Sequence, residues 1–158
     1  MSKENADKEQ KRSFKREAFS WIACIVVTIL LTEFILNFVI INANIPSGSM
    51  ENTIMTNDKL IALRTSYWFN DPKRGDIIIF KYPDDETEWF IKRVIALPGE
   101  TVLVKDGKVY INGSKKALSE PYIKEEPVED FGPYKVPKNG YFVMGDNRNY
   151  SKDSRFPD

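Results

Sequence analysis

The sequence predicts a mostly β protein that carries one N-terminal transmembrane helix, and three observations support this fold class. Residues 18–41 form an apolar run in which Glu33 is the one charged residue. All 9 prolines and all 8 glycines lie after residue 44, so a helix-compatible part precedes a turn-rich part. After residue 55, short β-branched and aromatic runs alternate with turn signals. We therefore expect a membrane helix followed by an antiparallel β-sheet or barrel-like domain.

The apolar run is long enough for a membrane anchor. As a helix rising ~1.5 Å per residue it spans about 36 Å, which exceeds a hydrocarbon core of ~30 Å. A removed secretory signal is the alternative, but its apolar region has roughly 7–15 residues and ends in an A-x-A-like site. This run is longer and is followed by Asn42-Ala43-Asn44. The predicted layout is a polar tail (1–17), an anchor helix (18–41) and a β-rich domain (42–158).

Flanking charge predicts the orientation of the anchor. Arg12, Lys15 and Arg16 precede the apolar run, and the next basic residue along the chain is Lys59. By the positive-inside rule the tail lies in the cytoplasm and the β-rich domain lies outside.

Glu33 and Asn37 are four residues apart, so they share a face of the predicted helix. An acid within a membrane span is a functional hypothesis by default. The alternative is a protonated Glu33 that hydrogen-bonds Asn37 or a neighbouring helix.

Six segments of the β-rich domain are predicted as strands. Asp106-Gly107 joins two of them and suits a type I′ hairpin turn. The proline-rich segment 119–137 is predicted as a long surface excursion. The six strands are 59–63, 76–80, 88–97, 101–105, 108–111 and 140–144.

Composition narrows the chemistry. The chain has 23 basic and 23 acidic residues, no histidine and one cysteine. The balanced charge gives no indication of a nucleic-acid partner, and the common zinc sites and Cys-His nucleophiles are excluded. We expect no metal and no cofactor. A nucleophile would be Ser or Thr, activated by Lys or a carboxylate. A lysine base requires its pKa to fall from ~10.4 to near 8, which costs roughly 3 kcal/mol of desolvation.

Lys92 is the candidate base because it lies within an apolar strand. The strand period of two places Phe90, Lys92 and Val94 on one face, while Arg93 points to the other. The alternative is an edge-strand lysine that guards against aggregation.

Ser49, in "IPSGSM" (45–50), is the candidate nucleophile. Gly48 would allow a sharp bend that exposes the Ser49 hydroxyl, and the Ser49 N–H with the Ser47 hydroxyl could form an oxyanion hole. Met50 and Ile54 would supply apolar depth beside it. The alternative is a turn that links the anchor to the domain.

The segment "GDNRNYSKDSR" (145–155) is the third cluster. Its spacing excludes an EF-hand loop, because Arg148 and Tyr150 occupy ligand positions. It is either a plain polar loop after a strand or a loop braced by ion pairs, with Ser151 and Ser154 as hydroxyls. The ion-pairing candidates are Asp146, Arg148, Asp153 and Arg155.

"IPSGSM", "RGDIIIF", "IKRVIALPGE" and "GDNRNYSKDSR" occur in this order after an apolar anchor. Together they resemble the bacterial type I signal peptidases over nearly the whole chain. The resemblance implies a β-rich catalytic domain of the signal peptidase type. It implies cleavage of signal peptides from exported preproteins at the outer face of the membrane. The implied partners are those signal peptides and the lipid bilayer, and the sequence makes no prediction of an oligomeric state.

The resemblance also implies a role for each matched residue. Ser49 matches the nucleophile, Lys92 the general base and Ser47 the hydroxyl that completes the oxyanion hole with the Ser49 amide. Ser151 matches the serine that orients the lysine. The residues that match positions supporting the site are Asp153 and Arg155, with Asp146 and Arg148 in the same loop.

Two departures from the family pattern are visible. The family commonly has proline where this chain has Asn52, a change in backbone stiffness that we expect to be tolerated. The family usually continues well beyond the "DSR" position, whereas this chain stops at "FPD" (156–158). It is therefore a fragment or an unusually short enzyme, and if packing strands are missing Lys92 would be more hydrated.

Two other functions are compatible with the sequence. One is an inactive anchored β module that binds exported chains or partner proteins. The other is a self-cleaving Ser/Lys protease such as a phage-type repressor, against which the membrane span and the absence of a DNA-binding region argue.

Overall fold

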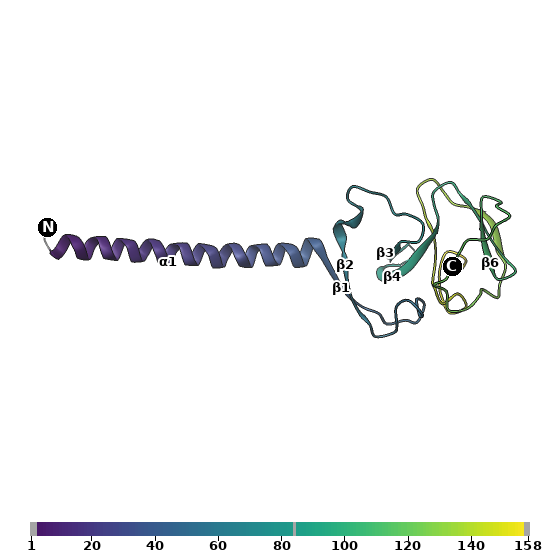
Figure 1. Ribbon diagram of the computed structural model, residues 1–158, viewed down its shortest axis with the longest axis horizontal. Helices are drawn as coiled ribbons and strands as arrows, with labels where there is room; N and C mark the ends of the chain where they lie inside the picture. The colour runs from purple at the N-terminus through teal and green to yellow at the C-terminus, as the bar shows by residue number, and fades with distance from the viewer. Residues whose placement is uncertain (1–2, 84, 157–158) are drawn as a thin grey trace. The chain divides into compact units, whose positions relative to one another are not determined.

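The computed structural model describes residues 3–83 and 85–156. Its described residues form a long N-terminal helix followed by short strands in three small sheets, which confirms the predicted fold class (Figure 1). The chain divides into a helical unit, which ends at Ile41 and includes 63–65, and a β-rich unit that takes the rest of the chain after Ile41.

Helix α1 (Lys3–Phe34) begins within the polar tail, where lysine, glutamate and glutamine are good helix formers. A π-helical turn (Ile35–Val39) follows, and strand β1 (Ile40–Asn44) begins before the apolar run ends. The prediction of helix up to residue 41 is therefore wrong for its last two positions, where β-branched residues favour strand. The stretch Phe14–Val39 is long and apolar enough to cross a membrane.

The polar pair of the helical unit is in contact. The Asn37 side-chain amide donates to the Glu33 carboxylate at 3.0 Å and to the Glu33 backbone carbonyl at 2.8 Å. The two residues therefore form the contact expected from the sequence, with Asn37 as the donor, and the protonated state of Glu33 stays a prediction.

Strands β2, β5 and β6 have the predicted bounds, and the other predicted strands differ at their ends. A 3₁₀ turn (Arg64–Tyr67) follows β2. The strands after β1 are β2 (Lys59–Leu63), β3 (Ile77–Tyr82), β4 (Asp85–Ala96), β5 (Thr101–Lys105), β6 (Lys108–Ile111), β7 (Phe131–Lys135) and β8 (Phe142–Met144).

The predicted hairpin between β5 and β6 is present. Lys105 pairs with Lys108 across the turn, and Asp106 and Gly107 both have positive φ, at 51° and 74°. Two left-handed central residues are the requirement of a type I′ turn.

Strand β7 corrects one expectation, because it lies within the segment predicted as a surface excursion. It pairs with β5 and forms one edge of the sheet β6–β5–β7. Pro133 lacks an N–H group, and an edge strand is the place in a sheet that tolerates this loss. Prolines made the segment look like a loop, and pairing with a distant strand overrode that local signal.

The sheet β3–β4–β8 positions the residues of interest. β4 is its central strand, and Lys92 pairs with Ile78 of β3. On the other side of β4, Arg93 pairs with Met144, the last residue of β8. The loop that begins at Gly145 therefore starts beside Lys92.

Two apolar clusters fix this arrangement. The larger one joins the ends of β4 and β8 to strands β5 and β6, and includes the buried Ile95, Val102 and Phe142. The smaller one consists of the buried Ile45, Met50 and Ile54, packed against Leu60, Ile77 and Ile91. Because Met50 and Ile54 flank the turn that follows Ser49, the second cluster holds that turn against the sheet.

Candidate active site

Ser49 lies in a tight turn between β1 and β2. The Glu51 N–H donates to the Gly48 carbonyl at 3.1 Å, and the Thr53 and Ile54 N–H groups donate to the Met50 carbonyl at 3.0 and 2.8 Å. Met50 is fully buried, and the Ser49 side chain lies beside it. The turn is therefore anchored by apolar packing on one side of its serine.

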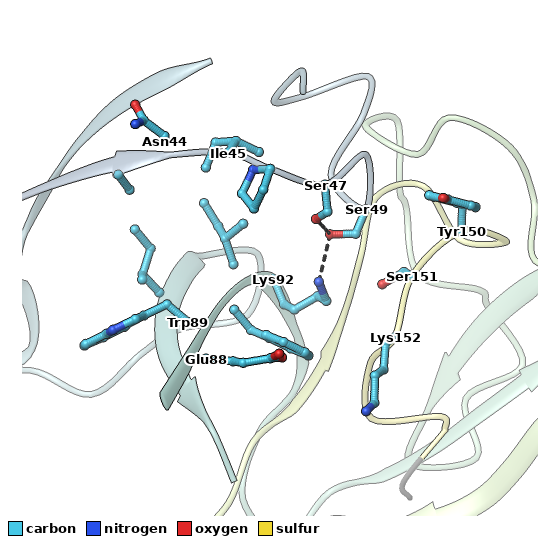
Figure 2. A pocket seen from close by; sticks show the side chains of 15 residues that line it. Asn44, Ile45, Ser47, Ser49, Glu88, Trp89, Lys92, Tyr150, Ser151 and Lys152 are labelled. Carbon is cyan, nitrogen blue, oxygen red and sulfur yellow. Dashed lines mark hydrogen bonds between the residues drawn. The ribbon is translucent and has the colours of Figure 1, made fainter. Parts of the chain in front are cut away.

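Lys92 lies next to Ser49. Its Nζ donates a hydrogen bond to the Ser49 Oγ at 2.8 Å, across 43 residues of sequence (Figure 2). The side chain is 4% exposed, and Nζ lies 5.0 Å from the centre of the Phe90 ring. Lys92 is thus a buried residue of a central strand. The alternative role as a charged guard on an edge strand does not fit this position.

Burial lowers the pKa of Lys92 from 10.5 to about 8, because desolvation disfavours the ammonium form. The negative charge of Asp153 acts in the opposite direction and is outweighed. A substantial fraction of the amine is therefore neutral in mildly alkaline solution, and a neutral amine can accept a proton from a hydroxyl.

Ser49 and Lys92 line one cleft of about 660 Å³, whose wall is mainly apolar. Ser47, Trp89 and Ser151 also line it, and Figure 2 shows the hydroxyl groups of Ser47 and Ser49 side by side above the lysine. The Ser47 Oγ is 3.4 Å from the Ser49 Oγ. The cleft brings together the predicted nucleophile, base and oxyanion-hole hydroxyl.

Ser151 lies in the same cleft but does not make the predicted bond to the lysine. Its Oγ is buried without a hydrogen-bond partner. In Figure 2 the Ser151 hydroxyl is directed toward the cleft, on the side of Lys92. An orienting role for Ser151 stays a prediction.

Gly145 brings the loop of Ser151 against the turn of Ser49. A Cβ at position 145 would lie 2.4 Å from the Ser49 carbonyl oxygen and 2.3 Å from the Ser151 Oγ. Backbone cannot yield to such a contact cheaply, so glycine is required for this approach.

The ion pairs of the loop 145–155 extend beyond it. Asp153 and Arg155 pair with each other, with Nε–Oδ1 and Nη2–Oδ2 distances of 2.9 Å, as expected. Asp146 instead binds Arg93 of β4, at 2.9 and 2.6 Å, and also accepts the Thr53 hydroxyl. Arg148 binds Glu120, at 3.0 and 2.6 Å. All four ion-pairing candidates therefore form ion pairs, but the partners of Asp146 and Arg148 lie outside the loop.

Sequence reasoning missed four residues at this site: Thr53, Arg93, Glu120 and Asn147. Strand alternation directed Arg93 away from Lys92 but gave it no partner. In the structure Arg93 is 9% exposed and its guanidinium lies 3.9 Å from the centre of the Tyr122 ring. A buried arginine needs an acid, and in the structure that acid is Asp146, which the sequence had grouped only with the charged residues of its own loop.

Asn52, where the family commonly has proline, has a φ of 86°. Asparagine tolerates this left-handed conformation, whereas the proline ring fixes φ near −65°. Its side-chain amide donates to the Tyr122 carbonyl at 3.0 Å.

Within the described part of the chain, no group of three His, Cys, Asp or Glu residues could hold a metal ion.

The family model described as "Signal peptidase, peptidase S26" matches residues 18–157. The chain belongs to the signal peptidase family. It is 45% identical over 136 residues to a probable signal peptidase I-2 of Synechocystis, a match that covers 83% of this chain and 62% of that protein. It is 38% identical over 157 residues to a signal peptidase I of Bacillus licheniformis, covering 93% of this chain and 83% of that protein.

A crystal structure of a signal peptidase I from Enterococcus faecalis has 39% sequence identity and a TM-score of 0.48, and the match covers 55% of this chain and 86% of that chain. Family membership confirms the resemblance noted from the sequence motifs, and it places the chain in a family of serine endopeptidases.

Burial of Lys92 should cost this signal peptidase stability. Lys92→Met is expected to stabilise the fold at pH 7 by about 3 kcal/mol, because it removes an ammonium whose pKa is lowered from 10.5 to about 8. Between pH 8 and 10.5 the unfolded wild type keeps the proton that the folded form releases, so wild-type stability rises with pH. The advantage of the variant should therefore disappear by about pH 11.

Urea unfolding of the full chain in detergent, followed by tryptophan fluorescence at pH 7 and pH 11, measures this difference. Lys81→Met, at an exposed lysine of β3, controls for the loss of a charge. An equal stability difference at both pH values would contradict the desolvation of Lys92.

Proposed function

We propose that the chain is a membrane-anchored serine endopeptidase that removes signal peptides from exported preproteins. The 2.8 Å contact between the Lys92 Nζ and the Ser49 Oγ, in a buried and mainly apolar cleft, is the observation that carries the proposal. The relatives named signal peptidase I support the choice of substrate.

In the proposed mechanism, neutral Lys92 accepts the proton of the Ser49 hydroxyl while the Ser49 Oγ attacks the scissile carbonyl carbon. The carbonyl oxygen becomes an oxyanion, which the Ser49 N–H and the Ser47 hydroxyl stabilise. The Lys92 ammonium then returns the proton to the leaving amine, and an acyl-enzyme on Ser49 remains. Water, with Lys92 again as base, hydrolyses the ester.

The supporting residues have proposed roles that follow from their contacts. Ser151 orients Lys92 from the wall of the cleft, where the buried Ser151 hydroxyl has no other hydrogen-bond partner among the described residues. The pair Asp153–Arg155 braces the Ser151 loop, since Asp153 also accepts the Gly145 N–H at 3.1 Å. Arg155 further donates to the Arg148 carbonyl. Asp146 and Arg148 join this loop to β4 and to Glu120.

The anchor and its orientation are part of the proposal. Residues 1–17 form a cytoplasmic tail, residues 18–39 cross the bilayer, and the chain from Ile40 onward forms the extracytoplasmic peptidase domain. The apolar stretch Phe14–Val39 and the basic residues before it support this layout. Ser49 is ten residues past Val39, so the nucleophile lies near the bilayer, where a signal peptide also lies.

Ser49→Ala and Lys92→Ala should each abolish preprotein cleavage, by at least 10³-fold in kcat/KM, because the nucleophile and base act as one unit. Cleavage is measured on a purified preprotein with the full-length chain in detergent. Ser154→Ala, in the loop 145–155 and outside the cleft lining, is the control and should retain activity. Substantial cleavage by either dyad variant would reject the mechanism, and a wild type without cleavage would favour the inactive binding module.

The pH dependence of kcat/KM should follow the protonation state of Lys92. Lys92 acts as a base only when neutral, and its pKa is about 8. Below that pH kcat/KM should rise about tenfold per pH unit, and it should level off above it. A pH profile from 5 to 10 on a peptide substrate tests this, and a rate already constant from pH 6 would argue against Lys92 as the base.

Orientation can be tested by cysteine labelling in a Cys24→Ser background. Val128→Cys, at a side chain that is 82% exposed, should react with a membrane-impermeant maleimide on intact protoplasts. Ser13→Cys should react only after the membrane is permeabilised, because the positive-inside rule predicts a cytoplasmic tail. The opposite labelling pattern would overturn the proposed topology.

A further inference from the structure

Asn147 binds the turn of Ser49 in two places. Its side-chain amide donates to the Gly48 carbonyl at 2.9 Å, and its backbone N–H donates to the Ser49 carbonyl at 3.0 Å. These two carbonyls belong to the peptide groups on either side of the Ser49 Cα. A single buried residue, 4% exposed, therefore fixes both peptide planes around the serine.

The identity of the Asn147 side-chain donor follows from its surroundings. The nitrogen faces two acceptors, the Gly48 carbonyl oxygen and, at 3.5 Å, the Glu51 carboxylate. With the amide turned over, its oxygen would face both of these oxygens, which is unfavourable. Glu51 is itself bound by Lys124 at 2.7 Å.

Peptide geometry connects this contact to the chemistry. Among the described residues the one cis peptide bond is Gly132–Pro133, so the Gly48–Ser49 peptide is trans. In a trans peptide the C=O and the N–H lie in one plane and point in opposite directions. Because the Gly48 C=O is directed at Asn147, the Ser49 N–H is directed away from Asn147. Rotation of this plane would turn the N–H out of its place.

We propose that Asn147 is a positioning residue that sets the direction of the Ser49 N–H toward the oxyanion. This inference rests on the proposed function, in which Ser49 attacks a carbonyl. In that step the Oγ–C bond forms, the carbonyl π electrons move to oxygen, and the hydroxyl proton passes to Lys92. The Ser49 N–H donates to the new negative charge, so its direction matters more in the transition state than in the bound substrate.

The expected effect is smaller than the loss of an oxyanion donor. The Gly48 carbonyl also accepts the Glu51 N–H at 3.1 Å, so the turn keeps one restraint without Asn147. Removing a whole donor costs about 10²–10³-fold, and we expect loss of the restraint to lower kcat about 10- to 100-fold.

Two variants of the full chain separate positioning from folding. Asn147→Ala removes the side-chain donor. Asn147→Asp keeps the size of the side chain and the backbone N–H but places an acceptor opposite the Gly48 carbonyl. The matched control is Asn149→Ala: Asn149 is in the same loop and also bonds backbone, donating to the Glu126 carbonyl at 3.0 Å and accepting the Val128 N–H at 2.9 Å.

Three constants are measured for each protein: kcat and KM on a peptide that spans a signal peptide cleavage site, and Ki for a matching peptide boronate. The boronate forms a tetrahedral anionic adduct with a serine hydroxyl and so mimics the oxyanion. Both Asn147 variants should lose kcat about 10- to 100-fold, keep KM within about twofold and bind the boronate more weakly by the factor lost in kcat. Asn149→Ala should match the wild type.

Unchanged boronate affinity, or a raised KM with kcat retained, would overturn the positioning role. If Asn147→Ala does not fold, Asn147→Asp alone decides the question. A kcat and a boronate Ki near the wild-type values would then show that the Asn147 side-chain N–H is unimportant. A wild type that neither cleaves the peptide nor forms a boronate adduct rejects the proposed function itself. A wild type that does both, and is matched by Asn147→Asp, overturns only the role of Asn147.

Discussion

The site depends on one constraint, the removal of the Lys92 amine from water. In the open solvent of a loop this amine would be almost fully charged at neutral pH and could not act as a base. In the central strand of the sheet it is 4% exposed and its pKa falls to about 8. The strand pairing, the apolar cluster below the Ser49 turn and the close approach at Gly145 all contribute to that exclusion of water.

Desolvation alone would fail if a carboxylate were free to pair with the lysine, because an ion pair raises the pKa of an amine. Asp146, Asp153 and Glu120 are acids with nearly inaccessible side chains in this region, and each is bound by an arginine. Asp153, the acid that attracts Lys92, is held by Arg155 through two hydrogen bonds. Arg155 therefore has a second effect besides bracing its loop: it engages the one acid whose charge acts on Lys92.

Adjacent positions of β4 show how finely this is arranged. The hydrogen bonds that Arg93 donates to the Asp146 carboxylate raise the pKa of Arg93, so this buried side chain remains a cation. Burial has the opposite effect on the pKa of Lys92, one residue earlier. Because successive strand residues point to opposite faces, one side chain meets an acid and the other meets apolar surface and a hydroxyl.

Local patterns were sufficient for much of the fold. The bounds of β2, β5 and β6 and the type I′ turn follow from alternation and turn chemistry, which act within a few residues. Strand β7 was missed because Gly132 and Pro133 disfavour a strand locally. The strand is stabilised by its pairing with β5, which is distant in the sequence. For the site, apolar flanks identified Lys92, but nothing local assigns Asp146 to Arg93 or Asn147 to Gly48. The pairing of β8 with β4 brings Asp146 to Arg93, and the close approach at Gly145 to the Ser49 turn brings Asn147 to Gly48.

That pairing also explains why the base is on a strand and not on a loop. Holding an amine at a pKa near 8 opposes folding by roughly 3 kcal/mol, a large share of a typical domain stability of 5–15 kcal/mol. A flexible segment would recover this energy by moving the ammonium into water. A central strand cannot, because displacing β4 would break its pairing with both β3 and β8 and expose the cluster around Ile95 and Phe142. The cooperative stability of the sheet thus offsets the free energy of burying the Lys92 amine. The reactive, neutral form of the lysine therefore depends on the whole β-rich unit.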